Sequence, residues 1–436
     1  MLPKNQKVCV VGLGYVGLTL AMHSVTKGYE VHGIEILDKT YDVIASGDTY
    51  FHEPGLDELL KLTLNKNFFV HKEIPKNQRF DIFIVTVGTP LVIGEKAPNM
   101  SVLDNAIESI SSFIKEDTLL VLRSTIPVGT SAQIAKDLKE KNNLSRINVS
   151  FCPERTAEGK ALIELQSLPQ IISGNNEEAL TKSHEFFENL SDEVLEAESL
   201  EEAEIIKLFN NTYRDATFAI ANTFNLISQS FNIDGSAVIE KANYNYIRSS
   251  ISKPGFVSGP CLEKDAYILS SNMEDGDLKN FLLSIRKANE NLEERLVDHI
   301  KSLFSKSASS KILISGIAFK GVPQTNDLRG SSAVKILDQL SEHASQITIH
   351  DFMNTRSELS EVSKIKAIDQ EEIFNPSSLT YDYIFILNNN PQYKSSKMQK
   401  FIANQISDGA KIIDTWDVMK LDKQFTLSNL FVESSL

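Results

Sequence analysis

The sequence predicts an α/β protein with a sheet-containing domain at each end and a helical segment between them. Three observations support this class. Short apolar runs alternate with amphipathic stretches through the first third of the chain, residues 201–234 contain neither glycine nor proline, and strand-like runs return after residue 310. Such alternation is typical of parallel sheets that are covered by helices on both faces.

The first domain, which we expect to span residues 1–198, contains apolar runs that are typical of buried parallel strands. Between these runs, apolar residues follow helical spacing, as at Leu56, Leu59 and Leu60. The pattern predicts a doubly wound sheet with strands at residues 8–12, 31–36, 82–87, 119–122 and 149–152.

The central domain, expected at residues 199–304, begins with a predicted long helix. Helical spacing continues to about Ser305 and is interrupted by a stretch with glycine and proline at residues 253–260. The polar segment 305–310 is a predicted linker. The last domain, expected at residues 305–436, is a second α/β unit without a glycine-rich motif of its own, with predicted strands at residues 312–317, 346–350, 383–387 and 411–414.

Composition narrows the possible partners. The chain carries 44 basic and 58 acidic side chains, a formal net charge of -14. A general binder of nucleic acid or of anionic membranes needs a basic surface, so we expect neither partner. Neither an apolar stretch of ~20 residues nor a secretory signal at Met1 to Lys7 is apparent, and we expect a cytoplasmic protein.

Cysteine and histidine usage also excludes some classes. Cys9, Cys152 and Cys261 are far apart and odd in number, which fits a reducing compartment better than a disulfide framework. The eight histidines follow no metal-ligand spacing, so the sequence predicts no metal site.

A glycine motif follows the first predicted strand. Gly12, Gly14 and Gly17 form GxGxxG between a strand and a helix, which permits a tight turn and close approach of a pyrophosphate. The second predicted strand ends in an acid, Glu35, whose carboxylate can accept the ribose hydroxyls and would repel a 2'-phosphate. The motif predicts a Rossmann domain that binds NAD rather than NADP. The alternatives are that the turn binds no nucleotide or that it binds FAD.

Seven short strings extend this interpretation across nearly the whole chain. Together, and in the same order, they resemble the UDP-glucose/GDP-mannose dehydrogenase family, whose members oxidise a nucleotide sugar at C6. The strings are GLGYVGL at 12–18, GTP at 88–90, STIPVGT at 124–130, CPER at 152–155, EAEIIKLFNNTYRD at 202–215, GPCLEKD at 259–265, and AFKG with TNDLRGS at 318–331.

The resemblance implies a cysteine mechanism. Oxidation of an alcohol to an acid needs two hydride transfers, and a thiolate can hold the aldehyde between them. Cys261 resembles that nucleophile, because it lies in a glycine-containing loop just before Lys264 and Asp265. Lys207 and Asn211 are four residues apart and therefore share one helix face. In the family, this pair stabilises the developing oxyanion.

The resemblance assigns further residues by position. Asp265 and Thr125 would orient water or accept a proton, and Glu154 is the candidate base for thioester hydrolysis. Glu158 lies closer to the nicotinamide. The remaining cofactor contacts are Tyr15, Val16, Thr89 and Arg329, and the expected substrate contacts are Arg155, Lys207, Asn211, Arg214, Arg248, Gly259 and Lys320.

Arg155 and Arg214 resemble the branch that oxidises UDP-N-acetylhexosamines, namely UDP-N-acetylglucosamine or UDP-N-acetylmannosamine. Family members form dimers through the long helix, so the resemblance implies a homodimer or larger homo-oligomer. In such an assembly Arg248 would reach a neighbouring subunit's site, although the string around it fits the family poorly.

The chain departs from the family at two positions. The cysteine loop is one residue short and has Ser258 where glycine is expected, and Thr223 replaces a glutamate. Serine resists backbone conformations that glycine permits, so the loop geometry and the substrate range stay open. Two alternatives remain: a UDP-glucose 6-dehydrogenase, and a nucleotide-sugar-binding protein with impaired turnover. A two-electron hydroxyacid dehydrogenase of similar fold would need no cysteine.

Overall fold

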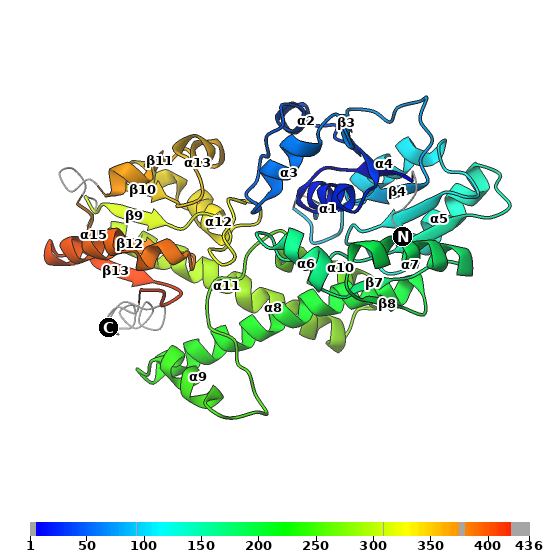
Figure 1. Ribbon diagram of the computed structural model, residues 1–436. Helices are drawn as coiled ribbons and strands as arrows, with labels where there is room; N and C mark the ends of the chain where they lie inside the picture. Colours follow the sequence, from blue (N-terminus) through cyan, green and yellow to red (C-terminus); the bar gives the residue numbers. More distant parts are fainter. Residues whose placement is uncertain (1–5, 93, 308, 375–379, 420–436) are drawn as a thin grey trace. The chain divides into compact units, whose positions relative to one another are not determined.

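The computed structural model describes residues 6–92, 94–307, 309–374 and 380–419 (Figure 1). The chain divides into two compact units. The first consists of Met1–Asn210 with Tyr267–Glu274, and the second of Asn211–Ala266 with Asp275–Leu436.

The first unit is built on a six-stranded parallel sheet in the order β3-β2-β1-β4-β5-β6. This order, with the reversal between β1 and β4, is that of a Rossmann fold and places the switch point beside the first strand. The strands are β1 Lys7–Val11, β2 Glu30–Ile34, β3 Phe68–His71, β4 Ile82–Val85, β5 Leu119–Leu122 and β6 Asn148–Phe151.

Helices cover both faces of this sheet. Along β1, Val8 and Val10 enter one apolar cluster, while Cys9 and Val11 enter the other, as the two-residue period of a strand requires. The helices are α1 Tyr15–Thr26, α2 Asp38–Ala45, α3 Leu56–Thr63, α4 Ser101–Ser111, α5 Thr130–Lys141, α6 Ala161–Ser167 and α7 Glu177–Leu190. A separate parallel pair consists of β7 Gln170–Ile172 and β8 Val194–Glu196.

Four helices follow the first sheet. The longest, α8, spans Leu200–Ser230, and its 31 residues without glycine or proline form one uninterrupted helix, as the sequence predicts. The others are α9 Gly235–Asn243, α10 Leu262–Ser271 and α11 Asp277–Lys306.

The second unit contains a five-stranded parallel sheet in the order β11-β10-β9-β12-β13. Its strands are β9 Ile312–Ser315, β10 Ile347–His350, β11 Lys366–Ala367, β12 Tyr383–Ile386 and β13 Lys411–Asp414. The remaining elements are α12 Ser332–Gln339, η1 Ser341–Gln346, α13 Arg356–Val362, α14 Gln370–Ile373, η2 Pro391–Lys394 and α15 Ser396–Ser407.

The predicted α/β class is confirmed. The structure adds strands β3, β7, β8 and β11, which the sequence pattern does not predict. Within the described residues, no helix combines the length and the apolar character needed to cross a bilayer.

Candidate active site

The glycine turn after β1 has the geometry of a dinucleotide cradle. Gly12 adopts φ 90°, and its N–H donates to the carbonyl of Ile34 at 2.9 Å. A Cβ on Gly17 would lie 1.9 Å from the carbonyl oxygen of Gly12, so helix and turn can meet only at glycine. A Cβ on Gly14 would meet nothing within 4 Å. The turn therefore leaves room at the N-terminus of α1, where a pyrophosphate is held.

Glu35 lies directly after β2, beside this turn. Its carboxylate is 7% exposed and accepts hydrogen bonds from the N–H groups of Leu13 at 3.2 Å and Leu37 at 2.9 Å. These bonds fix an acid at the position where a Rossmann fold recognises the adenosine ribose. The residues present therefore fit NAD.

Tyr15 and Val16 form the first turn of α1, and Tyr15 leads to a residue that the motif does not reveal. The Tyr15 hydroxyl donates to Glu53 at 2.7 Å, and Glu53 also accepts from the N–H of Gly159 at 2.8 Å. Glu53 is 5% exposed. It therefore joins the glycine helix to the loop that carries Glu158.

The loop with Thr125 is attached to α8 by a second buried acid. Glu204 is 1% exposed and accepts from the N–H groups of Gly129 at 2.6 Å and Ser131 at 2.9 Å. Burial raises the pKa of Glu204. Thr89 donates its hydroxyl to the carbonyl of Thr125. Through Glu204 and Thr89, the Thr125 loop is fixed both to α8 and to the segment that follows β4.

Glu154 is surrounded by donors. Arg123, whose side chain is fully buried, pairs with one carboxylate oxygen, and the N–H groups of Arg155 and Thr156 donate to the other at 2.7 Å each. Burial acts to raise the pKa of Glu154, but Arg123 and these donors outweigh it and lower the pKa. Glu154 is therefore ionised at neutral pH.

Helix α8 contributes the lysine and the asparagine predicted to share one face. The Lys207 ammonium donates to the carbonyl of Glu154. Asn211, one turn later and 6% exposed, donates to the carboxylate of Asp265 at 2.6 Å. Each residue thus reaches an acid, or the backbone of an acid, that the resemblance also assigns to catalysis.

Cys261 directly precedes α10 and is exposed. Its carbonyl accepts from the N–H groups of Lys264 and Asp265, so the cysteine lies at the positive end of a ten-residue helix. Lys264 pairs with Asp265 at 2.9 Å. Burial acts to lower the pKa of Lys264, but the charges of Asp265 and Cys261 outweigh it and raise the pKa. Helix terminus and ammonium both favour the thiolate.

A buried polar network supports the loop before Cys261. Asn222 donates to the carbonyl of Gly255 at 3.0 Å and accepts from its N–H at 2.8 Å. Arg286, 1% exposed, pairs with Asp215 at 2.7 Å and donates to the carbonyl of Leu262 at 3.2 Å. The loop is therefore held on both sides of the cysteine.

Sequence reasoning misses these supporting residues for different reasons. Arg123 is a charge at the end of an apolar strand and immediately precedes STIPVGT, which is a usable signal. Arg286 lies on an amphipathic helix, where a charged residue is ordinary and gives no signal. Glu53 and Glu204 are acids whose function appears only when their backbone partners are known.

The predicted arginine contacts differ in exposure and in their partners. The guanidinium of Arg155 donates to the carbonyl of Pro169. Arg214 and Arg248 are exposed, and Arg248 lies over the Tyr246 ring. Arg329 is exposed and forms an ion pair with Asp327 at 2.6 Å. Among the predicted site residues, Thr125, Glu154 and Lys207 belong to the first unit, and Asn211, Gly259, Cys261, Asp265, Lys320 and Arg329 belong to the second.

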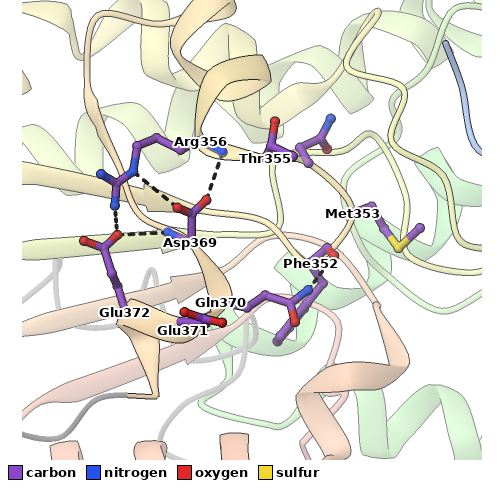
Figure 2. A pocket seen from close by; sticks show the side chains of 9 residues that line it. Phe352, Met353, Thr355, Arg356, Asp369, Gln370, Glu371 and Glu372 are labelled. Carbon is purple, nitrogen blue, oxygen red and sulfur yellow. Dashed lines mark hydrogen bonds and ion pairs between the residues drawn. The ribbon is translucent and has the colours of Figure 1, made fainter.

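A hollow at the carboxyl ends of β10 and β11 is a poor site for a diphosphate (Figure 2). Its cation, Arg356, pairs with Asp369 and Glu372, and Glu371 adds another negative charge. Among the residues that the structure describes, no group of three or more His, Cys, Asp or Glu side chains is placed to hold a metal ion.

A Rossmann cradle with an acid directly after its second strand defines the class: a nicotinamide-dependent dehydrogenase. Three family models match the chain. They describe the NAD binding domain at residues 6–191, the central domain at 201–291 and the UDP binding domain at 313–421 of the UDP-glucose/GDP-mannose dehydrogenase family. The chain belongs to this family.

Individual relatives from the curated proteins are similar to this chain over most of its length. The chain is 31% identical over 428 residues to a UDP-N-acetyl-D-mannosamine dehydrogenase of Methanococcus vannielii, covering 95% of this chain and 94% of the relative. A Campylobacter jejuni protein of the same name is 31% identical over 79% of this chain and 86% of its own length.

Among solved structures, the UDP-D-ManNAc dehydrogenase of Pyrococcus horikoshii matches with a TM-score of 0.82 and 26% identity, over 97% of this chain and 99% of its own. The UDP-N-acetyl-mannosamine dehydrogenase Cap5O of Staphylococcus aureus matches with a TM-score of 0.78 and 26% identity, over 98% and 99% of the two chains.

Proposed function

We propose that the chain oxidises the C6 hydroxyl of a UDP-N-acetylhexosamine to the carboxylate, with NAD as the acceptor of both hydrides. UDP-N-acetylmannosamine is the first substrate to test, because the relatives named above carry that activity in their names. The placement of Cys261 before α10, beside Lys264 and Asp265, is the observation that carries this proposal.

The chemistry balances as two oxidations and one hydrolysis. The C6 alcohol loses a hydride and a proton to give the aldehyde. The Cys261 thiolate adds to the aldehyde carbon, and the thiohemiacetal loses a second hydride to give a thioester. Water then attacks the thioester carbonyl, and the carbon–sulfur bond breaks to release the carboxylate, the thiolate and two protons. NAD supplies the acceptor for the two hydrides.

Polar groups around the reacting carbon have separate tasks in this proposal. Lys207 and Asn211 donate to the developing oxyanion, which is where fixed donors contribute most. Asp265 accepts the proton, assisted by Thr125, and its bond from Asn211 at 2.6 Å orients it. Glu154 acts in hydrolysis, and its lowered pKa keeps it in the basic form.

Binding roles complete the proposal. Gly12, Gly14, Tyr15, Val16, Gly17, Glu35, Thr89, Thr125, Glu158 and Arg329 hold the cofactor. The positively charged partners of the substrate diphosphate and sugar are Arg155, Arg214, Arg248 and Lys320, with Gly259 allowing close approach.

We also propose the domain limits 1–198, 199–304 and 305–436. We further propose a cytoplasmic location, with all three cysteines present as thiols.

Counting NADH per sugar tests the four-electron scheme. We expect two NADH for each UDP-sugar consumed, and a loss of at least ~1,000-fold in uronate formation in Cys261→Ala, which corresponds to ~4 kcal/mol of barrier. Iodoacetamide is an independent probe, because Cys9 and Cys152 are buried and only Cys261 is exposed. One NADH per sugar, or full activity in Cys261→Ala, would contradict the mechanism.

A substrate panel separates the alternatives. UDP-N-acetylmannosamine, UDP-N-acetylglucosamine and UDP-glucose are compared by kcat/KM under saturating NAD. A preference for UDP-glucose would replace the proposed substrate with the runner-up. Binding of these nucleotide sugars without NADH formation would favour the impaired binding protein.

We further propose a homodimer through α8. Exposed apolar side chains recur at helical spacing along this helix, at Tyr213, Ile220, Phe224 and Ile227, and exposed Phe231 follows directly after its end. A row of exposed aromatic and aliphatic groups is typical of a surface that another chain covers. Phe224→Glu is expected to give monomers in sedimentation velocity. Lys364→Glu, at an exposed position between α13 and β11, is expected to leave the assembly unchanged.

A further inference from the structure

We propose that Ser258 is a positioning residue for Lys320. Its hydroxyl ties the loop that carries Cys261 to the segment that carries Lys320, and so it helps to set the affinity for the UDP-sugar. The inference rests on the proposed function in one respect, namely that Lys320 contacts the substrate.

The tie consists of two hydrogen bonds from adjacent residues of the cysteine loop. The Ser258 hydroxyl donates to the carbonyl of Phe319 at 2.8 Å. The N–H of Gly259 donates to the carbonyl of Gly330 at 2.8 Å. The loop therefore contacts both ends of the long connection between β9 and α12, one end of which contains Lys320.

The Phe319 ring transmits this attachment to the lysine. A Cβ on Gly259 would lie 2.6 Å from the ring, so the ring packs directly on the Gly259 backbone. On the same ring, the Lys320 ammonium lies 5.2 Å from the centroid, within the range of a cation–π contact. A shift of the Phe319 backbone would therefore move the surface on which the lysine rests.

Other backbone groups of this segment are held from different directions. The N–H of Phe319 donates to the carbonyl of Asp327 at 3.1 Å. The N–H groups of Gly321 and Val322 donate to the side chain of Asn389 at 2.9 and 3.1 Å. Ser258 thus supplies the bond that comes from the cysteine loop, at the peptide unit immediately before Lys320.

Serine at this position needs no special backbone. Gly259 adopts φ 102°, whereas Ser258 is not among the described non-glycine residues with positive φ. The residue that departs from the usual glycine therefore fits without strain, and its hydroxyl provides a contact that glycine lacks.

Steady-state kinetics with separate titrations of UDP-sugar and NAD test the inference. In Ser258→Ala we expect the KM for the UDP-sugar to rise about fivefold, as for the loss of one hydrogen bond worth ~1 kcal/mol. The KM for NAD should stay unchanged, and Ser258→Thr, which retains the hydroxyl, should restore the UDP-sugar KM. Ser284→Ala is the matched control, because that hydroxyl bonds only within its own helix, to the carbonyl of Asn280.

Lys320→Ala and the double variant separate this inference from the proposed function. We expect Lys320→Ala alone to raise the UDP-sugar KM at least tenfold, and Ser258→Ala to add nothing in that background. Additive effects, or an unchanged KM in Ser258→Ala, would overturn the positioning role. An unchanged KM in Lys320→Ala would instead remove the substrate contact on which the inference rests.

Discussion

The two sheets begin with the same turn and then diverge. Gly12 after β1 and Gly316 after β9 have φ of 90° and 93°, and each donates its N–H at 2.9 Å to the last residue of the neighbouring strand. An acid comes directly after that strand in both sheets. Glu35 accepts the N–H of Leu13, and Asp351 accepts the N–H of Ile317 at 2.7 Å.

The two units differ in the segment after the turn. In the first sheet α1 begins at Tyr15, so the helix N-terminus lies at the turn. In the second sheet α12 begins only at Ser332, and a long connection that carries Lys320 and Arg329 intervenes. The first turn can hold phosphates with backbone N–H groups, whereas the second has charged side chains in the corresponding part of the chain. A shared turn therefore does not imply a shared way to hold a nucleotide.

The strongest loss should come from a change at Gly17, the third glycine of the first turn, where α1 packs on the turn. In Gly17→Ala the new methyl group would meet the Gly12 carbonyl at 1.9 Å. We expect a loss of more than ~3 kcal/mol in the free energy of unfolding of the first unit, and no NAD binding by calorimetry. Gly14→Ala is the matched control, because its Cβ has room. It should keep the stability and weaken only the binding of the cofactor.

The single tryptophan keeps the two units distinguishable in this experiment. Trp416 lies in the second unit, where its indole N–H donates to the carbonyl of Leu387 at 3.1 Å. Gly17→Ala should change the far-ultraviolet circular dichroism transition before it changes the Trp416 fluorescence transition. An identical shift in the midpoints of both unfolding transitions would mean that the two units do not unfold independently.

A buried histidine should make the stability of the second unit decrease at low pH. His350 precedes Asp351, where the first sheet has Ile34 before Glu35, and burial lowers the pKa of His350 to about 4. The unfolded chain takes up this proton near pH 6.5 and the folded chain does not. The contribution of neutral His350 to the free energy of unfolding is therefore fully present above the pKa of the unfolded chain. It decreases by about 3 kcal/mol as the pH falls toward 4.

The comparison of His350→Asn with the parent protein isolates this effect. Carboxyls with raised pKa in the same unit, such as Asp351 and Asp414, act in the opposite direction in both proteins. Urea unfolding followed by Trp416 fluorescence should show the variant gaining about 3 kcal/mol relative to the parent between pH 6.5 and 4. Parallel pH profiles would show that the histidine does not titrate in this way.

Substitution of the acids that follow β2 and β10, Glu35 and Asp351, should have a smaller effect, which is measured as cofactor affinity. Glu35→Gln keeps an acceptor for Leu13 or Leu37 but removes the charge. We expect NAD binding to weaken about tenfold and discrimination against NADP to decrease, since a charged hydrogen bond contributes ~1.5 kcal/mol. Asp351→Asn should leave the affinities for both cofactors unchanged. Equal effects of the two substitutions on NAD binding would contradict the distinction between the turns.

Much of this architecture could be predicted because it depends on buried, periodic strands. The four inner strands of the first sheet are largely buried along their length, and the GxGxxG motif begins directly after β1. The long helix α8 was predictable from the absence of glycine and proline over residues 201–234.

The missed strands of the two main sheets share a physical reason. β3 and β11 are edge strands that pair on one side only, and β11 has just two residues. β11 is too short to show a two-residue period, and the apolar run of β3, at residues 68–70, is shorter than the runs that predicted the other strands. The supports around the site were missed for a different reason. Arg286 pairs with Asp215, and Asn222 with Gly255, across more than thirty residues of sequence, and local sequence carries no record of those pairings.

The unequal exposure of the three cysteines has a practical consequence. Cys9 and Cys152 are sealed in the core of the first unit, and burial raises the pKa of both thiols, whereas Cys261 faces solvent. Among the thiols, peroxide should therefore act on one per chain, because sulfenic acid forms where thiolate is accessible. Storage in air should then abolish catalytic activity without unfolding the protein, and dithiothreitol should restore the activity.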